Sequence, residues 1–256
     1  MKIRIHNAIQ KYLLETQLWV AMMITALAGF YSSEHLLPER LFFIFFSTLG
    51  AYNFIHYHRF WINKKRKNSF IVFISSVLLT IFSFVIMKEK NIAMPVLALI
   101  ISVLFYNSWR FPVKLRNISL LKIFVISAVW TVAILYVGND GIWHFPIILS
   151  LFLLIFSVTL TFDIADQSTD KIKTIPMVLG TSKTKCIAII FLLISTVLFY
   201  CNTDNLYQNI AFGMSSILII LGIIVTQNKS NHYFYTRFWM EASLALPFII
   251  YTISKP

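Results

Sequence analysis

Three aspartates directly follow a long apolar segment of the chain, in the stretch FDIADQSTDK that begins at Phe162. Asp163, Asp166 and Asp170 are spaced i, i+3 and i+7, so on a helix turning about 100° per residue they share one face. Like charges crowded in this way repel, and an unpaired aspartate inside a membrane span costs about 2.5 to 3.5 kcal/mol. A divalent cation among the carboxylates relieves both costs, so we predict a metal site at Asp163, Asp166 and Asp170.

The chemistry of that site follows from its ligands. Oxygen ligands favour a hard cation, and Mg²⁺ commonly joins one or two carboxylates to the phosphates of a substrate. Lys171 and Lys173 follow the aspartates and are placed to contact phosphate. The alternative is that the aspartates only cap a helix or balance nearby lysines at a solvated interface. A cap needs a single aspartate, and the three together therefore favour Mg²⁺ with a phosphate-bearing substrate.

The elements that must position these groups are apolar helices. The chain has 256 residues, of which 58% are hydrophobic and 12% charged, and its mean hydropathy is +0.76. A spanning helix needs about 20 apolar residues, and runs such as LFFIFFSTLG do not alternate as barrel strands do. The sequence therefore predicts an all-α polytopic membrane helix bundle, one domain over residues 1–256, with about nine transmembrane helices near residues 14–31, 41–58, 70–87, 93–109, 120–137, 145–162, 187–200, 206–226 and 238–253.

Charge predicts how the bundle is oriented. With the N-terminus in the cytoplasm, almost all of the 22 Lys and Arg residues fall on the cytoplasmic side; the opposite side keeps only Arg40, Lys88, Lys90 and Lys255. The net charge of +12 is spread over loops between apolar spans, which indicates membrane topology and not nucleic-acid binding. We expect a multi-pass protein of a bacterial inner membrane, with its basic loops in the cytoplasm.

The segment from Asp163 to Gly180, DIADQSTDKIKTIPMVLG, resembles the second aspartate-rich motif of the UbiA superfamily of intramembrane prenyltransferases, D-x-x-D-x-x-x-D followed by Lys, Thr, Pro and Gly. Tyr106, Lys114 and Arg116 ahead of NISLLKIFVISAVW look like the family's connection between its fourth and fifth helices. Lys122 in that stretch is placed to reach the cytoplasmic mouth of the bundle.

The resemblance implies a UbiA-like fold and the transfer of an isoprenoid chain from a prenyl diphosphate to a lipophilic acceptor within the membrane. It implies Mg²⁺ held by the three aspartates. It also places Lys114, Arg116, Lys171 and Lys173 against the diphosphate.

The family's first motif, N-D-x-x-D, is degenerate in this chain. It should begin at Asn53, but Phe54 and Tyr57 stand where the two aspartates belong. Asn53, His56 and Arg59 remain as candidate contacts to the diphosphate. The alternative is that they are ordinary interfacial residues that touch anionic lipid. The missing carboxylates also support a second hypothesis, a non-catalytic UbiA-fold membrane protein that binds a lipid or a protein partner.

Overall fold

The computed structural model describes residues 16–32, 37–62, 67–87, 93–107, 121–137, 144–167, 173–226 and 236–255, and the regular elements in these ranges are all helical. This confirms the predicted all-α class. The helices are α2 (Leu18–Tyr31), α3 (Pro38–Ile62), α4 (Lys67–Met87), α5 (Ala93–Asn107), α6 (Leu121–Val132), η3 (Ala133–Val137), α7 (Phe145–Ala165), α8 (Ile175–Leu179), α9 (Thr181–Cys201), α10 (Leu206–Val225), η4 (Thr236–Met240), α12 (Glu241–Ser243) and α13 (Leu246–Ser254).

Local sequence signals mark where the helices begin. Pro38 is the first residue of α3, and Pro146 and Pro247 lie in the first turns of α7 and α13, where a missing N–H costs no hydrogen bond. Asn205 caps α10, since its side chain accepts hydrogen bonds from two backbone N–H groups of the first turn. The start of α7 coincides with that of the predicted span at 145–162, whereas α9 begins six residues before the predicted span at 187–200, and the last predicted span, 238–253, is divided among η4, α12 and α13.

Helix length and outer surface agree with a membrane location. Four helices are long and apolar enough to cross a bilayer, namely Ser69–Met87, Phe145–Ala165, Thr181–Cys201 and Leu206–Val225, and three shorter apolar helices accompany them among the described residues. Large apolar side chains stand exposed on the outer helices, including Leu78 and Phe82 of α4 and Val197 of α9. In water such a surface would be costly, whereas in lipid it is the expected one. The chain is an integral membrane protein.

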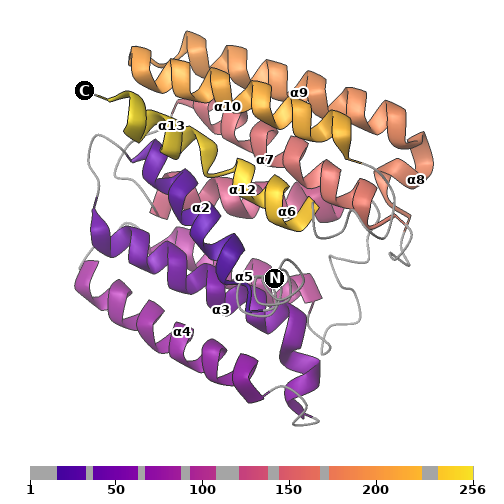
Figure 1. Ribbon diagram of the computed structural model, residues 1–256. Coiled ribbons are helices and arrows are strands. Elements are labelled where there is room, and N and C mark those ends of the chain that lie inside the picture. The colour runs from indigo at the N-terminus through magenta and orange to yellow at the C-terminus, as the bar shows by residue number, and fades with distance from the viewer. Residues whose placement is uncertain are drawn as a thin grey trace, which may run out of the picture.

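The helices pack as a closed circuit around an interior space. α3 packs against both α4 and α2, α2 against α13, α13 against α10, α10 against α9, α9 against α7, α7 against α6, α6 against α5, and α5 back against α3. Figure 1 shows α4 on one outer side of the bundle and α9 with α10 on the opposite side. Helices α2, α3, α5, α6 and α7 are thus placed to enclose a common site.

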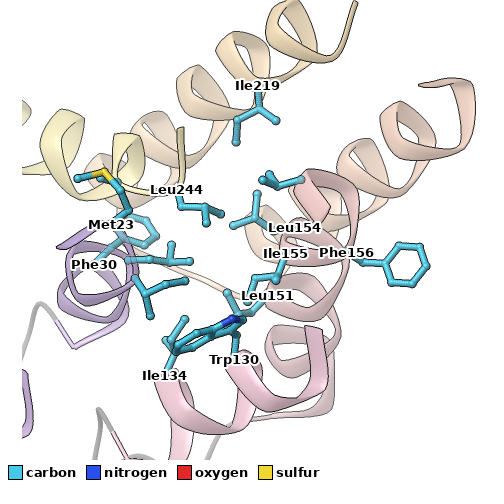
Figure 2. Close-up of a cluster of buried hydrophobic side chains, with 14 of the residues drawn as sticks. Met23, Phe30, Trp130, Ile134, Leu151, Leu154, Ile155, Phe156, Ile219 and Leu244 are labelled. Carbon is cyan, nitrogen blue, oxygen red and sulfur yellow. The ribbon is translucent and has the colours of Figure 1, made fainter. Parts of the chain in front are cut away.

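The main apolar core lies between α2, α6, α7, α10 and the C-terminal helices. Figure 2 shows Met23 and Phe30 of α2 beside Leu244, with Leu151 of α7 in the same cluster, whereas Phe156 points away from it. Rings extend the core toward the end of the bundle away from Asp163, where Phe199 and Phe212 stack with centroids 4.2 Å apart. This packing holds α2 and α7 in fixed positions on either side of the interior space.

Hydrogen bonds between serines fix α7 against α9. The Ser150 hydroxyl donates to the Ser195 carbonyl at 2.8 Å, and the Ser195 hydroxyl donates to the Ser150 carbonyl at 2.7 Å. Small polar residues of this kind let two membrane helices approach closely and bond across the contact. The position of α7, which carries Asp163, is therefore set by polar contacts as well as by packing.

Gly180 makes the turn between α8 and α9, and its replacement gives a first test of the fold. Its φ of 85° and ψ of 154° lie in a region that is essentially restricted to glycine. Gly180→Ala is expected to lower the free energy of unfolding by about 1 to 3 kcal/mol through backbone strain, measured by unfolding the purified protein in detergent.

Gly213 provides the matched control, because it lies inside α10 and a Cβ there would meet nothing within 4 Å. Gly213→Ala is expected to be neutral or stabilising by up to about 1 kcal/mol. Equal stability of the two variants would contradict the assignment of strain to Gly180.

Candidate functional site

A cavity of about 230 Å³ lies inside the circuit of helices, at the end of the bundle where α7 ends and α6 begins. Its wall combines a polar end with a long apolar surface. The polar side chains near the ends of their helices are Tyr106, Lys122, Asp163, Asp166 and Glu241; the other lining residues are Val20, Ile24, Ala51, Tyr52, Ile55, Ser102, Val103, Val125, Ile126, Val129, Trp130, Ile155, Val158, Thr159, Phe162, Ala165 and Leu244.

The strongest polar contact of the cavity is an ion pair between α6 and α7. The Lys122 Nζ lies 2.8 Å from the Asp163 Oδ1, and the two side chains are 17% and 3% exposed. A carboxylate this deeply buried is costly unless a cation is bonded to it. Lys122 is the second residue of α6 and Asp163 is in the last turn of α7, so these two helix ends are joined at the cavity.

Asp166 lies at the same end of the cavity, just past the helix. α7 ends at Ala165, and Asp166 is its C-cap residue, with its backbone N–H donating to the Phe162 carbonyl at 2.8 Å. Asp163 is inside the helix. The single helical face that we expected for all three aspartates therefore holds for Asp163 and Asp166, because Asp166 keeps a right-handed helical conformation. Asp170 lies outside the described residues.

The chain that follows Asp166 is tied back to the end of α7. The Gln167 side-chain amide donates to the Pro176 carbonyl at 3.3 Å and accepts from the Thr181 hydroxyl at 3.3 Å. Pro176 is in α8 and Thr181 begins α9. These bonds hold the two ends of the motif segment together beside Asp166.

The structure places the predicted phosphate contacts as follows. Lys173 is exposed, in the described segment just before α8, and does not line the cavity. Lys114, Arg116 and Lys171 lie outside the described residues, as do the side chains of His56 and Arg59, which are on α3. The part of the chain that the structure describes thus brings Asp163, Asp166 and Lys122 together, and the predicted lysine and arginine contacts remain predictions.

The described side chains of the degenerate first motif, Asn53 and Phe54, are used for packing. The Asn53 side chain is fully buried, and its amide nitrogen donates to the carbonyls of Leu49 and Thr16, each at 2.9 Å. Phe54 packs toward α4, with its ring 5.8 Å from that of Phe73. In these positions neither residue lines the cavity.

Sequence reasoning missed several residues of the site. Tyr52 lines the cavity and stacks on Trp130 of α6, with ring centroids 5.9 Å apart. Glu241 of α12 also lines it. One signal was present for the ion pair: Lys122 lies within an apolar helix, where a charge needs a buried partner, and Asp163 has the same need.

The donors present fit a divalent cation in part. Asp163 and Asp166 are three residues apart in the chain and line the same cavity. They offer the oxygen ligands that Mg²⁺ prefers. Asp163, however, already has a cation beside it in Lys122. Among the described residues no group of three or more His, Cys, Asp or Glu side chains is arranged to hold a metal. Asp170, water or a bound phosphate would supply the further ligands.

Comparison with known proteins identifies the fold. No protein-family model and no curated protein sequence matches the chain. Among solved structures, it is similar to a UbiA homolog from Archaeoglobus fulgidus in three forms. The form bound to GPP and Mg²⁺ has a TM-score of 0.60 at 14% identity, covering 91% of this chain and 96% of that one.

The form bound to Cd²⁺ has a TM-score of 0.64, and the form bound to DMAPP and Mg²⁺ one of 0.56, each at 13% identity and covering 96% of that chain. They cover 91% and 92% of this chain. The predicted resemblance is confirmed at the level of the fold, since the chain has the UbiA fold over nearly its whole length.

Proposed function

We propose that the chain is a prenyltransferase that moves an isoprenoid chain from a prenyl diphosphate to a lipophilic acceptor within the membrane. The observation that carries this proposal is the division of the cavity into a charged end and an apolar wall. On α6 the wall runs from Lys122 to Trp130, a distance of about 12 Å at 1.5 Å per residue. A diphosphate head suits the charged end, and a hydrocarbon tail suits the wall. The likeness in fold to a UbiA homolog bound to GPP and DMAPP supports the same substrate class.

Each part of the cavity has a task in this reaction. Breaking the bond between the first prenyl carbon and the diphosphate oxygen sends the electron pair to the diphosphate and leaves an allylic cation. Apolar residues would exclude water from that cation. Tyr52 and Trp130 line the same cavity with their rings stacked on each other, and an aromatic lining of this kind stabilises a cation. An electron-rich acceptor carbon then forms the new bond and loses a proton.

The polar residues neutralise the leaving group. Asp163 and Asp166, with Asp170, would hold Mg²⁺, which supplies positive charge to the departing diphosphate. Lys114, Arg116 and Lys171 would contact its oxygens, and so would His56 and Arg59 on the α3 side. Asn53 and Lys173 are left out of this set, because neither lines the cavity. The cavity end then faces the basic loops, which we place in the cytoplasm of a bacterial cell.

The direct test is binding of geranylgeranyl diphosphate to the purified protein with Mg²⁺ present, measured by calorimetry. Asp166→Ala removes a cavity carboxylate and leaves Lys122 and Asp163 themselves unchanged. We expect it to weaken binding by about tenfold or more, the effect of losing one charge-assisted contact. Asp204→Ala is the matched control, because Asp204 is exposed between α9 and α10, away from the cavity. No binding by the unmodified protein would refute the proposal.

A second candidate function is a non-catalytic UbiA-fold protein that binds a lipid or a protein partner. The observation that favours it is Phe54, which stands in the place of a first-motif aspartate and packs against Phe73. Under this reading, uncharged isoprenoids would bind the cavity as well as prenyl diphosphates do. Under the transferase reading, removal of the diphosphate should weaken binding strongly.

A further inference from the structure

The Lys122–Asp163 ion pair places a fixed positive charge on the wall of the cavity. Lys122 places an ammonium group 2.8 Å from Asp163, on the wall of the cavity in which we place the diphosphate. We infer that Lys122 is a built-in cation at Asp163 that takes over part of the neutralisation a divalent ion would supply, so that the site binds a prenyl diphosphate with a reduced need for metal. This inference rests on the proposed function.

Lys122 and a divalent cation compete for the Asp163 carboxylate. A divalent cation and an ammonium group both bind this carboxylate through its oxygens, and the lysine is covalently fixed beside it at the end of α6. A metal ion at Asp163 would share the carboxylate with Lys122 or displace it, and in either case it would meet a positive charge that lies 2.8 Å from the Asp163 Oδ1. Lys122 therefore lowers the affinity of Asp163 for metal.

The Lys122 ammonium group lies at the end of the cavity in which we place the diphosphate. Lys122 and Asp166 both line the charged end of the cavity, while Val125, Val129 and Trp130 continue the wall from α6. An ammonium group carries three N–H donors, so it is able to bond a phosphate oxygen while it stays bonded to Asp163. It thus meets the diphosphate directly.

The α3 segment next to the cavity carries few carboxylates. Where the resembled family carries aspartates on the second helix, this chain has Phe54, which packs against Phe73 of α4, and Tyr57. Fewer carboxylates hold fewer metal ions, and they also leave less negative charge for metal to offset. One fixed lysine in place of a metal ion suits a site with this smaller acidic set.

The test compares diphosphate binding with and without divalent metal in the full-length protein. Geranylgeranyl diphosphate is titrated into the protein in Mg²⁺ and in EDTA. In EDTA we expect the unmodified protein to lose less than about tenfold in affinity. Lys122→Met keeps the length of the side chain without its charge, and we expect it to lose about tenfold or more beyond that in EDTA and to recover when Mg²⁺ is restored.

Two further variants keep the result interpretable. Lys122→Arg retains the charge and should retain binding in EDTA. Recovery of Lys122→Met when Mg²⁺ is restored excludes irreversible misfolding as the cause of the methionine phenotype. Lys183→Met removes an exposed lysine of α9 that does not line the cavity, and it should behave as the unmodified protein does. Mn²⁺ binding without substrate, followed by electron paramagnetic resonance, should be tighter in Lys122→Met because Asp163 is released.

The outcomes separate this inference from the proposed function. If the unmodified protein binds the diphosphate in Mg²⁺ but loses it in EDTA as completely as Lys122→Met does, and the two proteins bind Mn²⁺ equally, the built-in cation is overturned and the transferase proposal stands. If the unmodified protein binds no prenyl diphosphate in Mg²⁺, both are overturned. Binding in EDTA that is lost in Lys122→Met supports both.

Discussion

Loss of one partner of the Lys122–Asp163 pair is expected to destabilise the protein more than loss of both. Lys122→Met leaves a carboxylate that is 3% exposed without its cation, and breaking a buried pair in this way costs about 3 to 5 kcal/mol. Asp163→Leu should cost less, because the Lys122 side chain is 17% exposed and is long enough to reach water at the cavity mouth. The double variant, Lys122→Met with Asp163→Leu, replaces the pair with apolar groups and should lie within about 1 kcal/mol of the unmodified protein.

The measurement is the free energy of unfolding of the four proteins in detergent, with EDTA present so that no metal takes the place of the lysine. The double-mutant cycle then isolates the coupling between the two side chains. Lys183→Met with Asp163→Leu is the control cycle, since Lys183 is an exposed residue of α9 and should not couple to Asp163. Additive effects of Lys122→Met and Asp163→Leu would contradict a buried ion pair between α6 and α7.

The fold was largely predictable because the bilayer imposes a simple rule on sequence. A span must be about 20 apolar residues long, and polar residues must gather at its ends. Because of this rule, the predicted span at residues 145–162 agrees with helix α7, Phe145–Ala165, to within three residues. The clustering of Asp163 and Asp166 was predictable for a related reason, namely that their spacing fits a single turn of helix.

The partner of Asp163 was not predictable from sequence alone. Lys122 and Asp163 are 41 residues apart, and only the packing of α6 against α7 brings them together. The sequence showed two charges at the ends of apolar helices, each needing a partner, and a metal among three aspartates was one solution. A lysine from the neighbouring helix is the solution that the structure contains for Asp163.

The register of α3 was the second feature that sequence alone did not show. The expected motif begins at Asn53 and Phe54. The structure instead turns Tyr52 to the cavity, stacked on Trp130, while Asn53 is buried and bonds to carbonyls of Thr16 and Leu49. A shift of one residue on a helix turns a side chain by about 100°, so a motif position does not reveal which neighbour faces the site.

Filling the apolar part of the cavity is expected to separate recognition of the tail from recognition of the head. Val129 lines the cavity on α6 two turns from Lys122, so both side chains lie on one face of the helix. In Val129→Trp the indole ring occupies space that we assign to the isoprenoid tail. We expect geranylgeranyl diphosphate to bind at least about tenfold more weakly, a loss of about 1.4 kcal/mol or more, whereas inorganic diphosphate should bind unchanged, because Lys122 and Asp166 are untouched.

Ala128→Trp is the matched control for the added ring, because Ala128 is the preceding residue of α6 but is exposed on its outer side and does not line the cavity. Both variants should unfold near the temperature of the unmodified protein. A weaker affinity for geranylgeranyl diphosphate in Val129→Trp would then be due to the filled cavity and not to a damaged fold. Calorimetric titration with each ligand gives the two affinities. If Val129→Trp binds geranylgeranyl diphosphate as tightly as Ala128→Trp does, the tail lies elsewhere, and the cavity wall on α6 does not recognise the isoprenoid.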